Sequence, residues 1–239
     1  MTETELRQKV VSAALAWLGT REYSAKHQEM LDIYNAQRPL PRGTRMLASW
    51  PWCAAFVSTV SLQCGLRDIM PTECGCPGMV RLYQEIGRWV ENDAYIPSPG
   101  DVIFYDWQDS GAGDNAGQPD HVGIVTACNG QTMTIIEGNC DNAVKTRTLA
   151  VNARFIRGYG CPDYASRADG AEPTPEPTPA PTPTPEPEKP AEATVDPFVT
   201  KTAREVIAGK WGNGQARKDA LAAWFTKAVQ DEVNRILGG

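Results

Sequence analysis

The sequence lacks long hydrophobic runs and an excess of basic residues, and each absence excludes a class of protein. No segment approaches the roughly 18 consecutive apolar residues that a membrane span requires. The net charge is −6, whereas binding to nucleic-acid phosphates needs a basic face. The first 20 residues carry acidic side chains before any apolar run and lack a small-residue cleavage site. We therefore expect a soluble protein without a signal peptide and with neither nucleic acid nor membrane as partner.

Histidine is scarce and the cysteines do not form a familiar framework. The chain has 2 histidines and 7 cysteines, an odd number, and no Cys-x-x-Cys pair. This composition argues against a disulfide scaffold. Cys74 and Cys76 are too close in sequence for the usual zinc-knuckle spacing. We expect no metal or cofactor, and we interpret six cysteines as small apolar or surface thiols and one as reactive.

One segment near the middle of the second half is dominated by proline. Residues 171–190 read AEPTPEPTPAPTPTPEPEKP, and alternating proline prevents both helix and sheet. Such a segment forms an extended polyproline-II spacer. The sequence therefore predicts three parts: a domain over 1–165, a Pro/Thr/Glu-rich linker over 166–195 and a small domain over 196–239. Their net charges are −4, −4 and +2.

The first part begins with helical patterns and ends with strand patterns. Helices are predicted from the N-terminus to about Leu18, from about Trp52 onward, and over 78–89. After Pro99-Gly100 follow DVIFYDW, HVGIVTAC, QTMTIIEG, KTRTLAV and RFIRGYG, all of which alternate like strands. The prediction is an α+β domain with an antiparallel sheet packed on helices. The tail predicts three short helices, an all-α domain.

A candidate nucleophile lies in the segment WPWCAAFV. Cys53 stands at the opening turn of a predicted helix, where free amides and the helix dipole stabilise a thiolate. A cysteine nucleophile needs a base, and His121 begins the strand HVGIVTAC. His27 lies in the polar stretch AKHQE, and we assign it a surface or hydrogen-bonded structural role because nothing near it in sequence tunes a pKa.

A carboxylate in the next strand could orient the histidine. A two-residue turn at Asn129-Gly130 would set His121 opposite Gly138, with Glu137 on the other side. A three-residue turn over 128–130, with Gly130 at positive φ, would set His121 directly opposite Glu137. We predict the three-residue turn, because a facing carboxylate stabilises the imidazolium.

The segments WCAAFV, PGDVIFYDW, DHVGIV and IIEGN resemble, in order and spacing, the CHAP family of cysteine- and histidine-dependent amidohydrolases and peptidases. The resemblance covers roughly residues 5–161 and implies a papain-like fold. It also implies Cys53 as nucleophile, His121 as base and then acid, Glu137 as orienting carboxylate and Asn139 as a supporting residue. Some members of the family bind calcium, but few acids precede Cys53, so no metal is carried over.

The resemblance predicts a peptidoglycan hydrolase that cleaves an amide bond by acyl transfer. N-acetylmuramoyl-L-alanine amidase and endopeptidase activities use the same chemistry, so both stay open. Trp50, Trp52 and Trp107 are candidates to line the substrate cleft, although large aromatic residues more often lie in a core.

The tail segments REVIAGKWGNGQARKDAL and AVQDEVNRIL resemble the short three-helix cell-wall-binding repeat of certain phage lysozymes. The matching positions imply that Trp211, Asn213 and Arg217 contact the disaccharide-dipeptide of peptidoglycan, while Trp211 is equally well explained as core. The usual Ala-Gly-Tyr-Asp is replaced by Ala-Ala-Trp-Phe-Thr. One repeat predicts weak affinity, which tethering or a homodimer through the tail would strengthen.

Three alternatives compete with this interpretation. A cysteine protease acting on proteins would share the catalytic residues, but the linker and wall-binding tail argue against it. A wall-binding or adhesion protein with an inactive domain would lack one of the catalytic residues. A housekeeping wall hydrolase would normally carry an export signal. We therefore favour a phage endolysin that waits in the host cytoplasm until lysis.

Overall fold

A computed structural model describes residues 1–92, 95–107 and 117–169. The chain divides into two units, Met1–Glu176 and Pro177–Gly239, and the described residues all belong to the first. The proline-rich segment and the predicted tail helices lie outside the described residues. The domain boundaries at 165 and 195 therefore stay predictions.

Four α-helices are found in the described part of the chain. The first starts with a capping box, in which Thr2 and Glu5 each bond to the other's backbone amide. The third ends at Gly65, whose left-handed conformation closes the last turn. The helices are α1 (Glu3–Leu15), α2 (Ala25–Ala36), α3 (Cys53–Cys64) and α4 (Cys76–Glu85), with short 3-10 turns η1 (Pro41–Gly43) and η2 (Tyr164–Arg167).

The strands form one six-stranded sheet in the order β1-β6-β2-β3-β4-β5. Every neighbouring pair is antiparallel. The strands are β1 (Trp89–Val90), β2 (Val102–Tyr105), β3 (His121–Cys128), β4 (Thr132–Cys140), β5 (Ala143–Ala150) and β6 (Ile156–Gly160). Mixed helices and an antiparallel sheet are consistent with the predicted α+β class.

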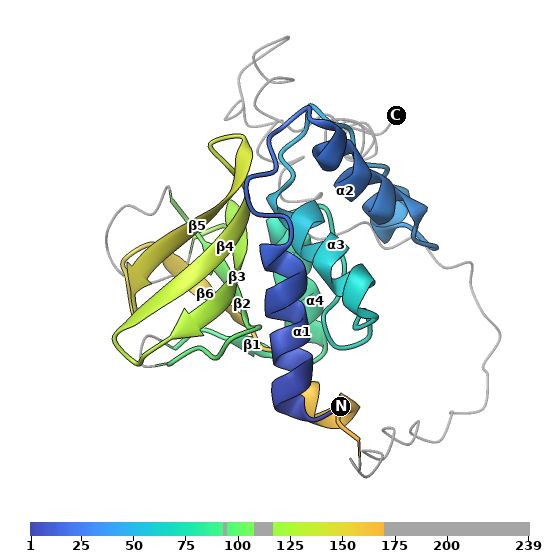
Figure 1. The fold of residues 1–239 in the computed structure, drawn as a ribbon. Coiled ribbons are helices and arrows are strands. Elements are labelled where there is room, and N and C mark those ends of the chain that lie inside the picture. Colours follow the sequence, from blue (N-terminus) through green and yellow to red (C-terminus); the bar gives the residue numbers. More distant parts are fainter. Residues whose placement is uncertain (93–94, 108–116, 170–239) are drawn as a thin grey trace, which may run out of the picture. The chain divides into compact units, whose positions relative to one another are not determined.

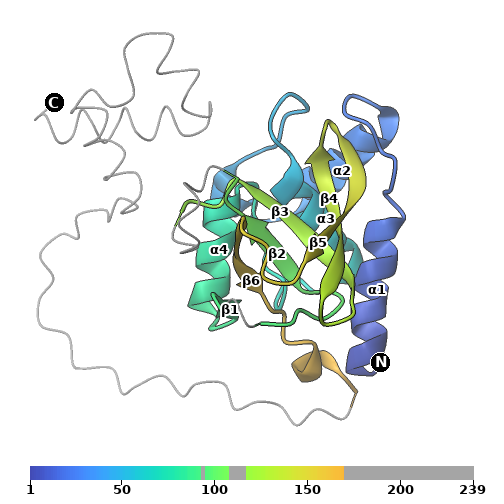
Figure 2. The ribbon, with the colours of Figure 1, turned by 90° about the vertical axis from the view of Figure 1, so that its left-hand side faces the viewer.

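The helices gather on one side of the sheet (Figures 1 and 2). Alternating strand residues such as Phe104, Ile124 and Ile136 pack against them in the main hydrophobic core. The strand residues between them, such as Tyr105 and Ile135, point the other way and form a second cluster on the opposite side of the sheet. Because strand side chains alternate between faces, each strand position is assigned to the helix side or to this outer side.

Two helix predictions were incomplete. Helix α2 was not predicted, because its sequence AKHQEMLDIYNA is mostly polar, yet it buries His27, Met30, Leu31 and Tyr34. The helix predicted over 78–89 begins and ends earlier, and Trp89 belongs to β1 instead.

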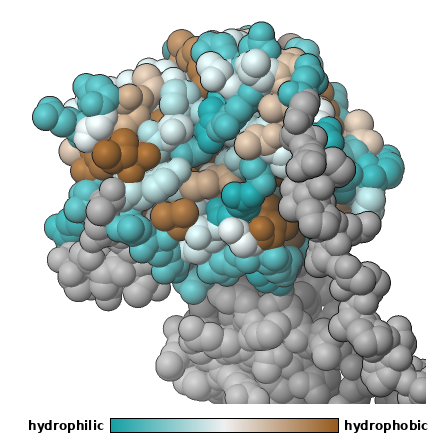
Figure 3. All heavy atoms as spheres, turned by 90° about the horizontal axis from the view of Figure 1, so that it is seen from below, coloured by the Kyte–Doolittle hydropathy of each residue, from teal (hydrophilic) through white to brown (hydrophobic). Residues whose placement is uncertain are grey.

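The surface of the described part is largely polar where Figure 3 shows it. Apolar residues on that face lie in small, separate spots, so it shows no broad patch of the kind that marks an interface. No helix in the described ranges is long and apolar enough to cross a membrane.

Candidate active site

Cys53 is the first residue of α3, as the sequence predicted. The N-cap residue, Trp52, makes no side-chain capping bond, and the Ala54 amide is directed at the Cys53 sulfur. The thiol is 5% exposed. A helix N-terminus favours negative charge, so this position suits a thiolate.

Helix α3 approaches the sheet closely because Gly138 has no side chain. A Cβ at Gly138 would lie 2.5 Å from Phe56 Cβ and 3.0 Å from the Trp52 ring. Trp52 is 0% exposed and lies 4.6 Å, between ring centroids, from His27. The prediction that Trp52 contacts substrate is therefore wrong: its ring fills the space beneath the N-terminus of α3.

His27 is also more constrained than its sequence context indicated. It is 0% exposed, and its Nδ1 accepts a hydrogen bond from the Tyr23 amide at 3.1 Å. Burial lowers its pKa. A structural role is consistent with these contacts, but the expectation that nothing tunes its pKa was wrong, because α2 places it in the core.

His121 begins β3 and interacts with Cys53 at the start of α3. Its Nε2 lies 3.3 Å from Glu137 Oε2, an ion-pair distance longer than a normal hydrogen bond. The ring stacks on Tyr105, its cross-strand neighbour, with centroids 5.8 Å apart. Cys53, Glu137 and Tyr105, each from a different element, thus orient the imidazole of His121. The contact with Tyr105 was not predicted.

The strand register that brings Glu137 to His121 differs from that of the predicted three-residue turn and from that of the two-residue alternative at Asn129-Gly130. Asn129 bonds to Thr132 across a two-residue loop, in which Gly130 has the predicted positive φ. Cys128 pairs with Met133, and Glu137 pairs with Gly123, not with His121. The predicted three-residue turn and the direct His121–Glu137 pairing were therefore wrong.

A β-bulge nevertheless places Glu137 on the same side of the sheet as His121. The pairing shifts between Val125 and Ala127, so Thr126 is an extra residue. Without that shift, counting from the turn would pair Glu137 with Ile124, on the helix side, since a one-residue slip reverses every side chain. With it, His121 and Glu137 become diagonal neighbours on one face.

Gly123 leaves room for this diagonal contact. A Cβ at Gly123 would lie 2.9 Å from Glu137 Cγ and 2.6 Å from Ile135 Cγ2. Any side chain there would displace the carboxylate from the imidazole. The glycine in HVGIV therefore has a role in the site that the sequence alone did not reveal.

Arg147 completes the line of charges and was missed by sequence reasoning. Its Nε lies 2.9 and 3.0 Å from the two carboxylate oxygens of Glu137, and its guanidinium lies over the Trp107 ring at 4.9 Å. Glu137 is 0% exposed, and a buried carboxylate needs partners. The alternation of KTRTLAV placed Arg147 in a strand, but only strand pairing shows which carboxylate it meets.

The charges of the site reinforce one another. Burial opposes the charged form of Glu137, but the contacts with His121 and Arg147 outweigh it and lower its pKa to about 2. Burial would likewise lower the pKa of His121, yet Cys53 and Glu137 raise it to about 10. Hydrogen bonding with Cys76, and then the contacts with His121, hold the pKa of Cys53 well below its ordinary value. Both shifts favour the charged forms of the pair, a thiolate on Cys53 and an imidazolium on His121.

Cys76 lies beside the candidate nucleophile. Its sulfur is 3.7 Å from Cys53 Sγ. All seven cysteines are free, so the contact is not a disulfide. The interpretation of Cys76 as a small apolar or surface thiol did not anticipate this contact, because 22 residues separate the two positions along the chain.

The remaining predicted positions lie at different places. Asn139 follows Glu137 in β4 with a left-handed φ of 56°, where the β4–β5 pairing is irregular. Trp50 packs partly buried against the main core and Trp107 against the outer cluster. Their substrate contacts stay predictions. Trp211, Asn213 and Arg217 lie outside the described residues.

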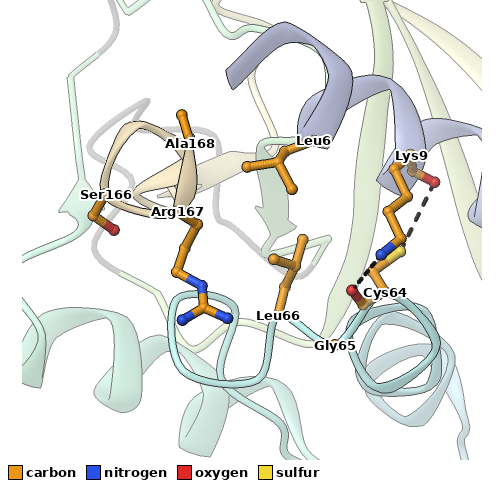
Figure 4. Close-up of a pocket in the computed structure, with 8 residues that line it drawn as sticks. All are labelled: Leu6, Lys9, Cys64, Gly65, Leu66, Ser166, Arg167 and Ala168. Carbon is orange, nitrogen blue, oxygen red and sulfur yellow. Dashed lines mark hydrogen bonds between the residues drawn. The ribbon is translucent and has the colours of Figure 1, made fainter. Parts of the chain in front are cut away.

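A pocket lies at the opposite end of α3 from Cys53 (Figure 4). It is lined by Leu6, Lys9, Cys64, Gly65, Leu66, Ser166, Arg167 and Ala168. At 1.5 Å per residue, the two ends of this helix are about 17 Å apart. Within the described ranges, no three His, Cys, Asp or Glu side chains are grouped to hold a metal ion.

The described geometry brings a cysteine, a histidine and a buried carboxylate together. Comparison with protein families finds a CHAP domain over residues 45–139 and a CW_7 repeat over residues 201–237. The first contains Cys53, His121 and Glu137, and the second lies in the tail. Neither the curated proteins nor the solved structures gave a match. The CHAP domain suggests peptidoglycan amidase or endopeptidase activity, and the CW_7 repeat suggests cell-wall binding.

Proposed function

We propose that the protein is a peptidoglycan hydrolase that cleaves an amide bond with Cys53 as nucleophile. The observation that carries the proposal is the chain of contacts Cys53–His121–Glu137–Arg147 inside the CHAP match. A cysteine on the first turn of a helix and a histidine on the sheet also support the papain-like assignment.

The reaction follows from the charges at the site. The Cys53 thiolate attacks a wall-peptide carbonyl, and amides of the first turn of α3 are placed to stabilise the oxyanion. The His121 imidazolium gives its proton to the leaving amine and then accepts one from the water that hydrolyses the thioester. Glu137 keeps its negative charge throughout, and Asn139 is assigned a supporting role.

The direct test is mass spectrometry of purified peptidoglycan digested with wild-type protein or with Cys53→Ala. We expect fragments from the wild type that are absent with Cys53→Ala, a loss of at least about 10³-fold, as expected when a nucleophile is removed. Cys64→Ala is a matched control, because it removes a buried thiol from the far end of α3.

The fragment masses would distinguish an amidase from an endopeptidase. Equal cleavage by Cys53→Ala would refute the cysteine mechanism. An intact wall with both proteins, together with tight wall binding, would support an adhesion module instead. Cleavage of proteins but not of wall would support a cysteine protease.

The tail is assigned to wall binding. We propose that residues 196–239, joined through the 166–195 linker, hold the catalytic domain at peptidoglycan through Trp211, Asn213 and Arg217. The CW_7 match over 201–237 supports this assignment. A homodimer through the tail, the endolysin role and a cytoplasmic location before lysis stay predictions from the sequence.

A further inference from the structure

Two helices bring their first residues together at the nucleophile. Cys53 begins α3 and Cys76 begins α4, and their sulfur atoms are 3.7 Å apart. Each side chain is 5% exposed. The separation matches a thiol hydrogen bond and far exceeds the roughly 2.05 Å of a disulfide.

A buried thiolate needs partners that compensate its lost hydration. The titratable groups that face Cys53 are Cys76 from α4, His121 from β3 and Asp120 just before β3. His121 supplies positive charge, whereas Asp120 supplies negative charge that opposes the thiolate. An additional donor next to Cys53 therefore has a large effect on how much thiolate forms.

Cys76 keeps its proton under the same conditions. Hydrogen bonding to Cys53, burial, and the negative charges of Cys53 and Asp120 raise the pKa of Cys76 well above its ordinary value. Either sulfur could donate at this distance. Because His121 and the Ala54 amide both interact with Cys53, negative charge is better stabilised on Cys53, which makes Cys76 the donor and Cys53 the acceptor.

We propose that Cys76 is a positioning residue whose S–H group donates a hydrogen bond to the Cys53 thiolate and holds it ready for attack. Its catalytic consequence rests on the proposed function, but the contact itself requires no substrate. Cys76 loses no proton and forms no bond during the reaction. It acts only through Cys53, by stabilising and orienting the nucleophile.

The test is the pH dependence of Cys53 alkylation by iodoacetamide, measured by peptide mass spectrometry on the reduced full-length chain. Cys76→Ala and Cys76→Val both remove the donor, and valine also keeps the space filled. We expect the alkylation midpoint to rise by about one pH unit, which is roughly tenfold less thiolate below the midpoint. Cys76→Ser keeps a donor and should restore the wild-type midpoint.

The matched control is Cys64→Ala, which should leave the midpoint unchanged because Cys64 lies at the other end of α3. An unchanged midpoint in a folded Cys76→Ala or Cys76→Val protein would overturn the proposal. A Cys76→Ser protein that folds but behaves like Cys76→Ala would also overturn it, since Cys76 would then act through its size or shape alone.

Peptidoglycan cleavage measured in parallel separates this inference from the proposed function. Under the proposal, Cys76→Ala should lower kcat near neutral pH with little change in KM. A midpoint shift in Cys76→Ala, together with no wall fragments released by the wild-type protein, would refute the proposed function and leave the Cys53–Cys76 contact standing.

Discussion

At the scale of single residues, the site is a line of alternating charges. Cys53, His121, Glu137 and Arg147 follow one another from α3 across β3, β4 and β5, and the pKa shift of each favours its charged form. Each buried charge has a neighbour of opposite sign, which offsets the cost of its burial. Removing any one of these four charges should therefore shift the pKa of the neighbouring side chain.

Removing the charge of Glu137 tests this dependence. The raised pKa of His121, about 10, means that wild-type activity rises as Cys53 loses its proton and falls only as the pH passes about 10. Glu137→Gln removes the negative charge, so the pKa of His121 falls and the alkaline limb of the kcat/KM profile moves to lower pH. We also expect a loss of about 10²-fold near neutral pH.

The pH profile is measured with peptidoglycan fragments as substrate, and the apparent values belong to the coupled pair. Glu29→Gln is a control, because it neutralises an exposed glutamate on α2. An alkaline limb that stays in place in Glu137→Gln would show that Glu137 does not set the charge of His121.

Substitution of Arg147 should shift the alkaline limb in the opposite direction to substitution of Glu137. Arg147→Met removes the positive charge beside Glu137, so the carboxylate acts on His121 alone and the alkaline limb should move to higher pH. The free energy of unfolding should fall by on the order of 2 kcal/mol, below the cost for a fully buried pair because the Arg147 side chain is 33% exposed. Denaturant unfolding and the pH profile measure both effects.

Arg147→Lys keeps the charge, so its unfolding free energy and the pH of its alkaline limb should both lie between those of the wild type and Arg147→Met. A shift of the alkaline limb to lower pH in Arg147→Met would contradict the assigned order of charges.

At the scale of elements, the site depends on how closely α3 and β3 pack on β4. Gly138 admits the N-terminal turn of α3 on the helix side, and Gly123 admits Glu137 on the outer side. The bulge at Thr126 determines which residues of β4 face each side. The two glycines and the bulge residue thus allow Cys53 and Glu137 to reach the same histidine, His121.

Substitution of Gly138 tests the close approach of α3. The added methyl of Gly138→Ala would lie 2.5 Å from Phe56 Cβ, so the helix must move or the protein is strained. We expect a loss of about 1–3 kcal/mol in unfolding free energy, as for other overpacked cores, and lower wall cleavage because Cys53 moves with α3.

The control is Gly130→Asn, at a turn with a positive φ of 88° and open space around it, where asparagine is tolerated. Its effect should stay below about 1 kcal/mol. If Gly138→Ala unfolds like the wild type and cleaves wall equally well, close packing at Gly138 is not needed to place the nucleophile.

At the scale of the whole molecule, chemistry and wall attachment are assigned to different parts of the chain. The contacts of Cys53, His121, Glu137 and Arg147 all lie within Met1–Glu176, and the CW_7 match lies in 201–237. If the tail serves only to hold the enzyme at the wall, its loss should lower the local enzyme concentration without changing the protonation of Cys53.

Deletion of residues 196–239 should therefore abolish co-sedimentation with insoluble peptidoglycan and lower wall cleavage at dilute enzyme by on the order of 10²-fold. The pH midpoint of Cys53 alkylation should not change. Arg217→Ala in the full-length chain should weaken sedimentation in the same direction. Undiminished sedimentation of the truncated protein would place wall binding in the first 195 residues instead.

The sequence by itself placed Cys53 at the start of a helix and His121 at the start of a strand, and it predicted the mixture of helices and antiparallel strands that is consistent with the α+β class. These features depend on local patterns: a cysteine two residues after a proline at a helix start, and alternation along strands. The sequence also indicated Glu137, although by a turn that does not form. Motif order was sufficient there because the residue type and strand were right even when the register was wrong.

Only the tertiary structure decided the register, the partners of Glu137 and the burial of Trp52. A bulge changes which face every later residue occupies, and no local pattern announces where the extra residue falls. Arg147 and Cys76 meet the site from distant segments, through strand pairing and through the meeting of two helix ends. Contacts of this kind depend on how whole elements pack, which single-residue patterns do not specify.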